Sequence, residues 1–297
     1  MLKRNNRGKI IAVLIAVFAV LCISVVFIFV NSDAIFARFG LRSKFLPQNG
    51  IMYVNFIDVG QGNCALITCG ETSILVDSGE EPYAQTVTNY IKNQNIRKLD
   101  AVIATHPHSD HIGSLYKVLN EIDADKIYLP EIPQEFETDE SFYTNLMEKS
   151  DIISFVKGGF SFTQGELKIE FFAPLGSYDD LNNYSLVTKI SFKNNSVLIA
   201  ADAKEDVEND ILKSTADLRA DILGVGHHGS GSSSSDEWLN AVNPEFAVIS
   251  CGENNDYGHP NTELIKRLEA HNICSSRTDL SGNILFRCDG NKVEEIN

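Results

Sequence analysis

The sequence carries little positive charge for its size. Its 297 residues hold 25 Lys and Arg against 40 Asp and Glu, a formal net charge of −15. Four of the basic residues stand among the first nine, so the rest of the chain is more acidic still. A domain of this charge gains little from general attraction to phosphate backbones, which excludes a broad basic surface for nucleic acid. It leaves open the local binding of phosphate at a metal.

Cysteine is scarce and unpatterned. The six cysteines contain no C-x-x-C pair, and only Cys22 lies near the amino terminus. The other five are scattered and odd in number, which excludes a zinc knuckle and a disulfide framework. Four of these five stand in apolar, strand-like runs, so we predict buried free thiols. No repeat of about 20–50 residues is present either, which excludes a solenoid.

Charge is absent from Ile10 to Val30, the run IIAVLIAVFAVLCISVVFIFV. A helix of this length rises about 30 Å, the thickness of the hydrocarbon core of a bilayer. Signal peptides have shorter apolar cores and a small-residue cleavage site, which NSDAIFA matches poorly. We therefore predict one transmembrane helix, an uncleaved signal-anchor over 10–30, with a cleaved signal as the alternative. The basic tail 1–9 predicts a cytoplasmic amino terminus, and hence a membrane protein with an extracytoplasmic domain.

After a predicted linker over 31–50, residues 51–297 indicate one domain in which strands and helices alternate. Helices are expected over 82–95, 139–149, 203–213, 236–242 and 261–271, and the apolar positions from Ile112 to Ile122 fit one further helix face. Strands are expected in MYVNFIDV, CALITC, SILVDS, LDAVIAT, KIYL, IEFFA, SLVTKISF, SVLIAA, ADILGVG, EFAVIS, ICSSR and NILFRC. This order predicts an α/β (α+β) fold of stacked sheets covered by helices. The Gly- and Ser-rich run 229–235 indicates a flexible loop.

The run ATHPHSDHIGS follows a predicted buried strand and holds three of the seven histidines. Its candidate ligands are His106, His108, Asp110 and His111. Imidazole and carboxylate together suit zinc, iron or manganese. Four candidates exceed what one catalytic zinc with an open position needs, so two adjacent metals, about 3.5–4 Å apart, are indicated.

Further ligands are expected at later strand ends. Asp202 ends the apolar run VLIAAD, where it is placed either to bridge two metals or to cap the helix expected over 203–213. His227 and His228 end DILGVGHHGS, and two histidines at a strand end favour a ligand over a core residue.

Together these residues resemble the metallo-β-lactamase fold superfamily. Asp77 in ILVDSG, the H-x-H-x-D-H run, Asp202 and a later histidine occur in that family's order. A narrower resemblance, over about residues 51–290, is to the hydrolase domain of the ComEC-type competence proteins. It is carried by FIDVGQGNCALI, THPHSDHIGS, NNYSLV, VGHHGSGSSS, YGHPN and RTDLSGNI.

The resemblance implies a four-layer αββα sandwich that binds two divalent metal ions, Zn or Mn. His106 and His108 would hold one ion and Asp110, His111 and a later histidine the other, with Asp202 between them. We favour His228 over His227 because HGS fits the family's pattern. Asp77 would orient the metal loop.

One departure concerns the first metal. Many superfamily members have a third histidine before the bridging aspartate, whereas this chain has none between His111 and His227. The corresponding region is NNYS, which makes Asn182, Asn183 or Ser185 a further candidate and leaves occupancy of the second metal position open. A single anchor without a channel also gives no support for DNA import by this chain alone.

The predicted function is metal-dependent hydrolysis, most simply of a phosphodiester, by a metal-activated water. Asp110 would orient or deprotonate that water, and His259 in YGHP would donate a hydrogen bond to the substrate, unless it only forms a turn. The expected partner is a phosphoester, either nucleic acid or a cell-envelope polymer, and no obligate protein partner is indicated. Alternatives are a membrane-tethered domain without catalysis, and hydrolysis of a β-lactam or thioester.

Overall fold

The computed structural model describes residues 47–133 and 141–296. The predicted basic tail, the predicted anchor and most of the predicted linker therefore lie outside the described residues. Among the residues that the structure does describe, none belongs to a helix with the length and apolar character needed to cross a bilayer.

Eight described strands form the first sheet, in the order β17-β16-β1-β2-β3-β5-β7-β8. Their bounds are β1 Met52–Phe56, β2 Ala65–Cys69, β3 Thr72–Val76, β5 Ala101–Ile103, β7 Ile127–Pro130, β8 Ile153–Val156, β16 Ile284–Cys288 and β17 Val293–Ile296. Pairing is antiparallel from β17 to β3 and parallel from β3 to β8. Strands β1 to β3 are buried along their whole length, which explains their almost continuous apolar sequence.

Seven described strands form the second sheet, in the order β15-β14-β13-β12-β11-β10-β9. Their bounds are β9 Ser161–Gln164, β10 Leu167–Phe171, β11 Thr188–Phe192, β12 Asn195–Ile199, β13 Ile222–Gly224, β14 Phe246–Ile249 and β15 Cys274–Arg277. Strands β9 to β12 pair antiparallel and β12 to β15 pair parallel. A short additional pair joins β4 Lys98–Leu99 to β6 Asp123–Ala124.

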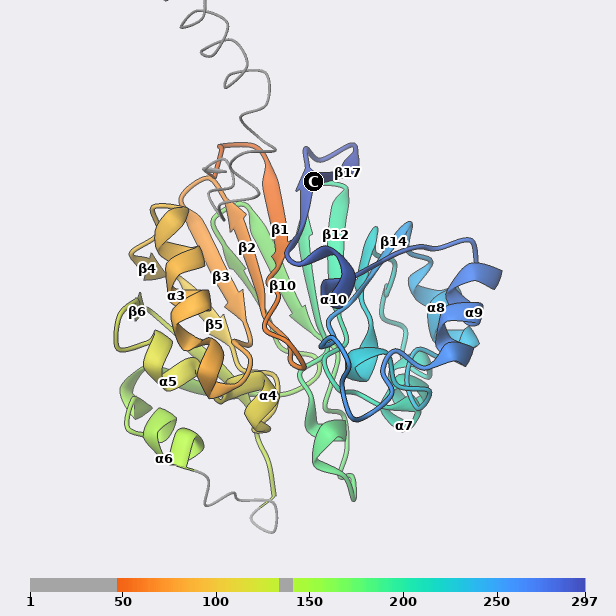
Figure 1. The fold of residues 1–297 in the computed structure, drawn as a ribbon, viewed down its shortest axis with the longest axis horizontal. Helices are drawn as coiled ribbons and strands as arrows, with labels where there is room; N and C mark the ends of the chain where they lie inside the picture. Colours follow the sequence, from red (N-terminus) through yellow and green to blue (C-terminus); the bar gives the residue numbers. More distant parts are fainter. Residues whose placement is uncertain (1–46, 134–140, 297) are drawn as a thin grey trace, which may run out of the picture. The chain divides into compact units, whose positions relative to one another are not determined.

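Helices cover the outer faces of the two sheets (Figure 1). Beside the first sheet lie α3 Ala84–Asn93, α4 Ser109–Ile112, α5 Leu115–Val118 and α6 Ser141–Met147. Beside the second lie α7 Glu205–Leu212, α8 Asp236–Val242 and α9 Thr262–Ala270, while α10 Thr278–Ser281 links β15 to β16. The described residues thus have the αββα layering that the resemblance implied.

Three apolar clusters hold these layers together. The central one lies between the sheets and includes Phe171, Phe192 and Phe286, which are at most 1% exposed. The other two pack the second sheet against α7 to α9 and the first sheet against α3 to α6. Each fully buried large apolar side chain stabilises the fold by about 1.5–3 kcal/mol. The clusters therefore make a rigid frame for the loops at the sheet ends.

The single helix expected from Ile112 to Ile122 is broken into α4 and α5. The backbone oxygen of Asp110 accepts a hydrogen bond from Asn63 N at 3.0 Å instead of from Ser114 N. Ser114 N donates to Gly79 O at 2.9 Å. Gly113 lies between the two helices, where a Cβ atom would come within 2.4 Å of Ser109 O. The loops of Asn63 and Gly79 thus replace hydrogen bonds of a continuous helix and hold the segment that carries the His-rich run.

The expectation of a flexible loop over 229–235 is also corrected. Ser233 and Ser234 are at most 1% exposed. The buried carboxylate of Glu208 accepts hydrogen bonds from Ser234 N and Ser235 N. Arg267 donates to the carbonyl oxygens of Ser233 and Ser234. The low-complexity composition therefore serves a compact, hydrogen-bonded turn in which small side chains fit.

Four of the five described cysteines are buried free thiols, as the sequence predicted. Cys64, Cys69, Cys251 and Cys288 are buried and free, and Cys274 is exposed. Burial raises the pKa of Cys288 to about 12, which makes this thiol unreactive.

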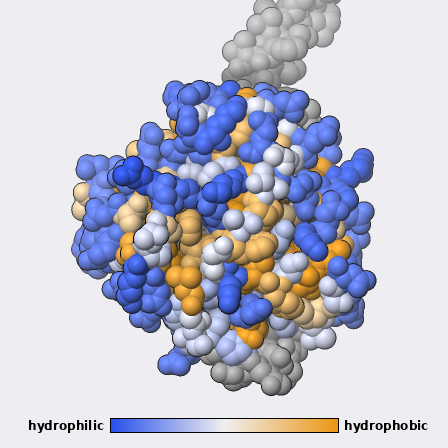
Figure 2. All heavy atoms as spheres, turned by 180° about the vertical axis from the view of Figure 1, so that it is seen from behind, coloured by the Kyte–Doolittle hydropathy of each residue, from blue (hydrophilic) through white to orange (hydrophobic). Residues whose placement is uncertain are grey.

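Figure 2 shows the rear face, on which hydrophobic side chains gather in the middle and hydrophilic ones surround them.

Candidate metal centre

The polar residues predicted as a site follow the carboxyl ends of strands in both sheets. In the first sheet Asp77 follows β3 and His106 comes shortly after β5, and these two strands are parallel neighbours. In the second sheet Asp202 comes shortly after β12 and His227 shortly after β13, again parallel neighbours. Carboxyl ends of parallel strands share one edge of a sheet, where ligands bind. Each sheet therefore contributes part of one site.

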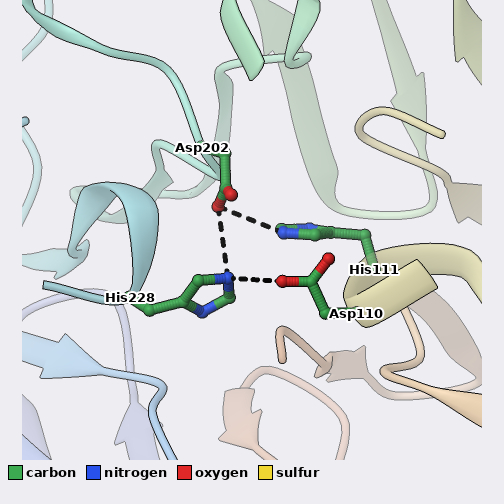
Figure 3. A group of neighbouring side chains, drawn as sticks. All are labelled: Asp110, His111, Asp202 and His228. Carbon is green, nitrogen blue, oxygen red and sulfur yellow. Dashed lines mark hydrogen bonds and ion pairs between the residues drawn. The ribbon is translucent and has the colours of Figure 1, made fainter. Parts of the chain in front are cut away.

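Four of the predicted ligands, Asp202 and three others, form one group, in which two histidines approach the Oδ1 oxygen of Asp202 (Figure 3). His111 Nε2 lies 3.1 Å from this oxygen and His228 Nε2 lies 3.5 Å from it. Asp110 joins the group through Oδ2, which is 3.1 Å from His228 Nε2. The donor atoms of all four residues lie within 4.8 Å of one another. We call this group, Asp110, His111 and His228 around Oδ1, the inner side.

A second group gathers at the other oxygen of the same carboxylate. His106 Nε2 lies 2.9 Å from His108 Nδ1 and 3.9 Å from Asp202 Oδ2. These three residues also place donor atoms within 4.8 Å of one another. We call His106 and His108 around Oδ2 the outer side. Because Asp202 belongs to both groups, it stands where a bridging ligand would stand.

The inner histidines are held from behind by strong acceptors. His111 Nδ1 donates to Asp77 Oδ2 at 2.7 Å, and His228 Nδ1 donates to Ser250 O at 2.9 Å. Asp77 also accepts from Thr105 N at 2.8 Å and from Thr105 Oγ1 at 2.7 Å. In the neutral ring such a bond keeps the proton on Nδ1, and the lone pair of Nε2 then faces the site. Asp77 is thus located where the resemblance put it, behind the metal loop.

The region NNYS supplies support behind the outer side. Ser185 Oγ lies 3.2 Å from the rear nitrogen of His106, Nδ1, and accepts from Asp202 N at 3.1 Å. Asn183 Oδ1 accepts from Lys204 N at 3.1 Å. Both candidate side chains are therefore engaged with a ring or with backbone and do not join the two ligand groups.

His227 and His259 lie at the mouth of the site. His227 Nε2 lies 3.7 Å from Asp202 Oδ2. The backbone of His259 is held by Asn255, whose Oδ1 accepts from His259 N at 2.9 Å. The ring atom Nδ1 of His259 is buried and finds no hydrogen-bond partner among the described residues. Both histidines line the cleft described below.

Several residues at the site have backbone conformations that are unusual for residues other than glycine. Positive φ angles occur at Asp77 (55°), Ala201 (48°), His227 (52°) and His228 (53°). Residues held in this region cost about 1–3 kcal/mol each and persist where the surrounding structure imposes them. All four are predicted site residues or direct neighbours of one, while six other described residues with positive φ lie elsewhere, four of them asparagine.

The electrostatics of the site favour ionised carboxylates and protonated inner histidines. Burial alone would raise the pKa of Asp202, but His111 and His228 outweigh it and hold that pKa well below its usual value. The pKa of Asp110 is lowered in the same way, against the effect of burial. Conversely, the carboxylates around His111 and His228 raise the pKa of both rings, although burial opposes the shift. Two ionised carboxylates thus share a mostly buried pocket.

The donor set fits divalent metal ions. His111 Nε2 and Asp202 Oδ1 are buried and have no hydrogen-bond partner within the described part of the chain, although they lie 3.1 Å apart. Burial lowers the pKa of His106 well below its usual value, and His111 adds to this shift, so the ring is neutral. Converging imidazole nitrogens and carboxylate oxygens suit zinc, manganese or iron.

A cleft of about 420 Å³ opens over the site. It is lined by Gln61, Pro107, His108, Ser109, Asp110, Leu181, Asn182, Asp202, His227, His228, Tyr257 and His259. None of these described lining residues is Lys or Arg. Tyr257 is 72% exposed, and its ring is stacked on that of His259 with the centroids 5.7 Å apart.

Sequence reasoning missed several residues of this site. Thr105 was overlooked, although it directly precedes the His-rich run and binds Asp77. Tyr257 stands in the quoted segment YGHPN, but an aromatic residue in a loop carries no signal of its own. Gln61 braces the site by accepting from Gly252 N at 3.0 Å. Only the position of Thr105 next to the motif was a usable sequence signal.

Comparisons with known proteins agree with the motif-based resemblance. Residues 57–253 match the family model of the Metallo-beta-lactamase superfamily. ComE operon protein 3 of Bacillus subtilis (strain 168) is 28% identical over 253 residues, covering 79% of this chain and 33% of that protein. Competence protein ComA of Neisseria gonorrhoeae is 31% identical over 248 residues, covering 82% and 33%. The chain thus spans about a third of the length of these curated relatives.

A solved structure shows the same fold. CmlA, a diiron beta-hydroxylase from Streptomyces venezuelae, superimposes with a TM-score of 0.56 at 16% identity, covering 89% of this chain and 59% of that one. At this identity the likeness concerns the fold alone. The family match and the competence proteins confirm the resemblance drawn from the motifs.

Proposed function

The chain belongs to the metallo-β-lactamase superfamily, and on that premise we propose that it is a membrane-anchored, metal-dependent hydrolase of phosphodiesters. The observation that carries the proposal is the pair of ligand groups on the two oxygens of Asp202. Divalent ions, when bound at such a site, lower the pKa of water and neutralise charge that builds on a phosphoryl group.

Residues that line the cleft would position the water and the substrate. The side chain of Asp110 is 26% exposed, and this carboxylate lines the cleft, so it can orient a water molecule and accept its proton. Burial lowers the pKa of His259, so its neutral ring can donate one hydrogen bond to a substrate oxygen. Leu181, Pro107 and Tyr257 give the cleft apolar walls that would hold the group attached to the phosphate.

The cleft supports a substrate with few negative charges. It has no Lys or Arg among its described lining residues, and the chain as a whole has a net charge of −15. A long duplex would meet repulsion instead of the counterion release that drives such binding. We therefore favour a short phosphodiester or an envelope polymer. A nuclease acting on single strands is the second candidate, and the competence proteins among the relatives favour it.

The test uses the full chain purified in detergent and loaded with Mn²⁺ or Zn²⁺. Bis-p-nitrophenyl phosphate, single-stranded DNA and nitrocefin are assayed in parallel, and bound metal is measured. His108→Ala should abolish hydrolysis, and His271→Ala is the matched control because this histidine pairs with Asp236 away from the site. Equal rates for the unaltered chain and His108→Ala on every substrate would disprove the enzyme proposal. Cleavage of nitrocefin alone would favour a β-lactamase.

We also propose that residues 10–30 anchor the chain with the catalytic domain outside the cytoplasm. The support is the uncharged run preceded by four basic residues. A protease added to intact cells should then digest the domain. Protection of the domain in cells whose envelope admits the protease would reverse the orientation.

A further inference from the structure

The two sides of the proposed metal centre have unequal numbers of candidate ligands. The inner side has Asp110, His111 and His228 in addition to the shared carboxylate. Among the described His, Cys, Asp and Glu residues, the outer side has only His106 and His108 in addition to it. In the region NNYS, Ser185 and Asn183 are engaged elsewhere, and Asn182, whose buried Oδ1 has no hydrogen-bond partner among the described residues, lines the cleft. The outer side therefore has one imidazole or carboxylate ligand fewer than the inner side.

His227 is placed to supply that ligand. Its Nε2 atom lies 3.7 Å from Asp202 Oδ2, slightly nearer than His106 Nε2 at 3.9 Å. Its approach is thus to the oxygen of the outer side, while His228 approaches Oδ1. The next residue in the chain serves the inner side, so the pair His227–His228 spans both sides of the carboxylate.

The His227 ring also has the orientation of a ligand. Its rear nitrogen, Nδ1, lies 3.4 Å from Ser232 Oγ, which leaves Nε2 facing Asp202. The rings of His111 and His228 are arranged in the same way, with Nδ1 bonded behind and Nε2 toward the carboxylate. Metal-bound histidines typically show this pattern of a rear hydrogen bond.

The backbone of His227 is held firmly at some cost. Its φ angle of 52° lies in the left-handed region, which glycine would occupy without strain. His227 N donates to Ala201 O at 2.7 Å and Ser230 N donates to His227 O at 2.8 Å. A strained histidine in a fixed turn is best explained by a need for its side chain.

We infer that His227 is the third imidazole ligand of the outer side, in place of the histidine that the NNYS region lacks. This inference rests on the metal centre of the proposed function. His227 Nε2 is not yet within 4.8 Å of both other outer histidines, so binding requires the ring to turn inward. The side chain is 21% exposed at the cleft, which leaves it room to do so.

The test measures metal content and affinity of the full chain, and needs no turnover. His227→Asn removes the imidazole and keeps a residue that tolerates the left-handed region. His228→Asn is the matched variant for the inner side, and His271→Ala is the control. Bound Zn²⁺ is counted by mass spectrometry after dialysis, and Zn²⁺ affinity is measured by calorimetry. Circular dichroism verifies that each variant is folded.

The expected result is that His227→Asn weakens one of two Zn²⁺ sites by at least roughly tenfold, since even outer-shell changes weaken metal binding about 10–100-fold. Unchanged Zn²⁺ stoichiometry and affinity in His227→Asn would overturn the inference. If the KM for bis-p-nitrophenyl phosphate rises while Zn²⁺ binding is unchanged, the His227 ring contacts the substrate and not the metal, which also overturns it. If the unaltered chain binds Zn²⁺ at two sites and His227→Asn weakens one of them, but no substrate is hydrolysed, the proposed function fails while the inference stands. A chain that binds no Zn²⁺ refutes both.

Discussion

The two oxygens of Asp202 face different surroundings. Around Oδ1 the rear nitrogens of the histidines donate to a carboxylate, Asp77, and to a backbone carbonyl, that of Ser250. Around Oδ2 the rear nitrogens meet hydroxyl groups: His106 Nδ1 lies 3.2 Å from that of Ser185 and 3.3 Å from that of Thr105, and His227 Nδ1 lies 3.4 Å from that of Ser232.

Hydrogen bonds to charged groups are shorter and roughly twice as strong as neutral ones, so the inner side is the better organised. His108 and His227, on the outer side, are also more exposed than the buried His111 and His228. The comparison teaches that one shared carboxylate can join a tightly supported group of candidate ligands to a loosely supported one. The following variants test that difference.

The largest effect is expected for Asp202→Ala, which removes the residue common to both sides. Both ions should be lost, and with them several kcal/mol of transition-state stabilisation, or roughly 10³-fold in kcat/KM at about 1.36 kcal/mol per tenfold. Metal content and hydrolysis of bis-p-nitrophenyl phosphate measure this. Retention of one tightly bound ion would show that the sides do not depend on a shared carboxylate.

Asp77→Asn and Ser185→Ala compare the supports of the two sides. Asp77→Asn should weaken inner-side Zn²⁺ binding by about 10–100-fold, because His111 loses its anionic acceptor. Ser185→Ala removes only a neutral hydroxyl behind His106, so a smaller loss is expected, confined to the outer side. Calorimetric titration with Zn²⁺ separates the two. A larger effect from Ser185→Ala would reverse the assigned order of the sides.

His227→Gly separates strain from ligation on the outer side. Relieving the left-handed conformation should stabilise the metal-free chain by about 1 kcal/mol, because glycine adopts positive φ without steric cost. The same change should weaken outer-side metal binding. Urea unfolding with a chelator present measures the first effect. A loss of stability would mean that the His227 ring contributes more to packing than its backbone costs.

Glu208 is expected to give the smallest effect, through the loop that carries Ser232. Burial raises the pKa of Glu208, although the backbone N–H groups of Ser234 and Ser235 oppose the shift. The folded chain therefore holds this proton more tightly than the unfolded chain. The resulting stabilisation is complete below about pH 4.5, the unfolded value, and declines as pH rises through the folded value.

The measurement is urea unfolding without metal at pH 4.5 and at pH 7. Glu208→Gln lacks this titration, so the stability difference between unaltered chain and variant should shrink as pH rises. Glu269→Gln on α9 is the control, because Glu269 is exposed and is not among the groups that shift the pKa of Glu208. If the stability difference does not change with pH, the pKa of Glu208 is the same in the folded and unfolded chain.

Local patterns predicted much of the frame. The helix expected over 236–242 matches α8, and the apolar runs from Met52 to Val76 form β1 to β3. Periodicity and end signals are local, so they can be seen in the chain. Strand β17 was missed because VEEI is short and places two adjacent acidic residues between two apolar ones, so it lacks the alternation of a half-buried strand.

The errors have a different origin. The break between α4 and α5 arises because Asp110 O and Ser114 N bond to loops far away in the sequence. The compact turn over 229–235 depends on Glu208 and Arg267, which belong to two separate helices. No local pattern encodes such partners, so composition alone suggested a flexible loop.

The amino-acid sequence by itself determined which side chains are available for metal chemistry and at which strand ends they stand, because ligand type and spacing are properties of the chain. Only the tertiary structure decided how they are divided. It turned Oδ1 of Asp202 toward His111 and His228, and Oδ2 toward His106 and His227. It also placed the hydroxyl group of Ser185 behind the ring of His106. These outcomes depend on how two sheets meet at one edge, and that packing brings together residues about a hundred positions apart.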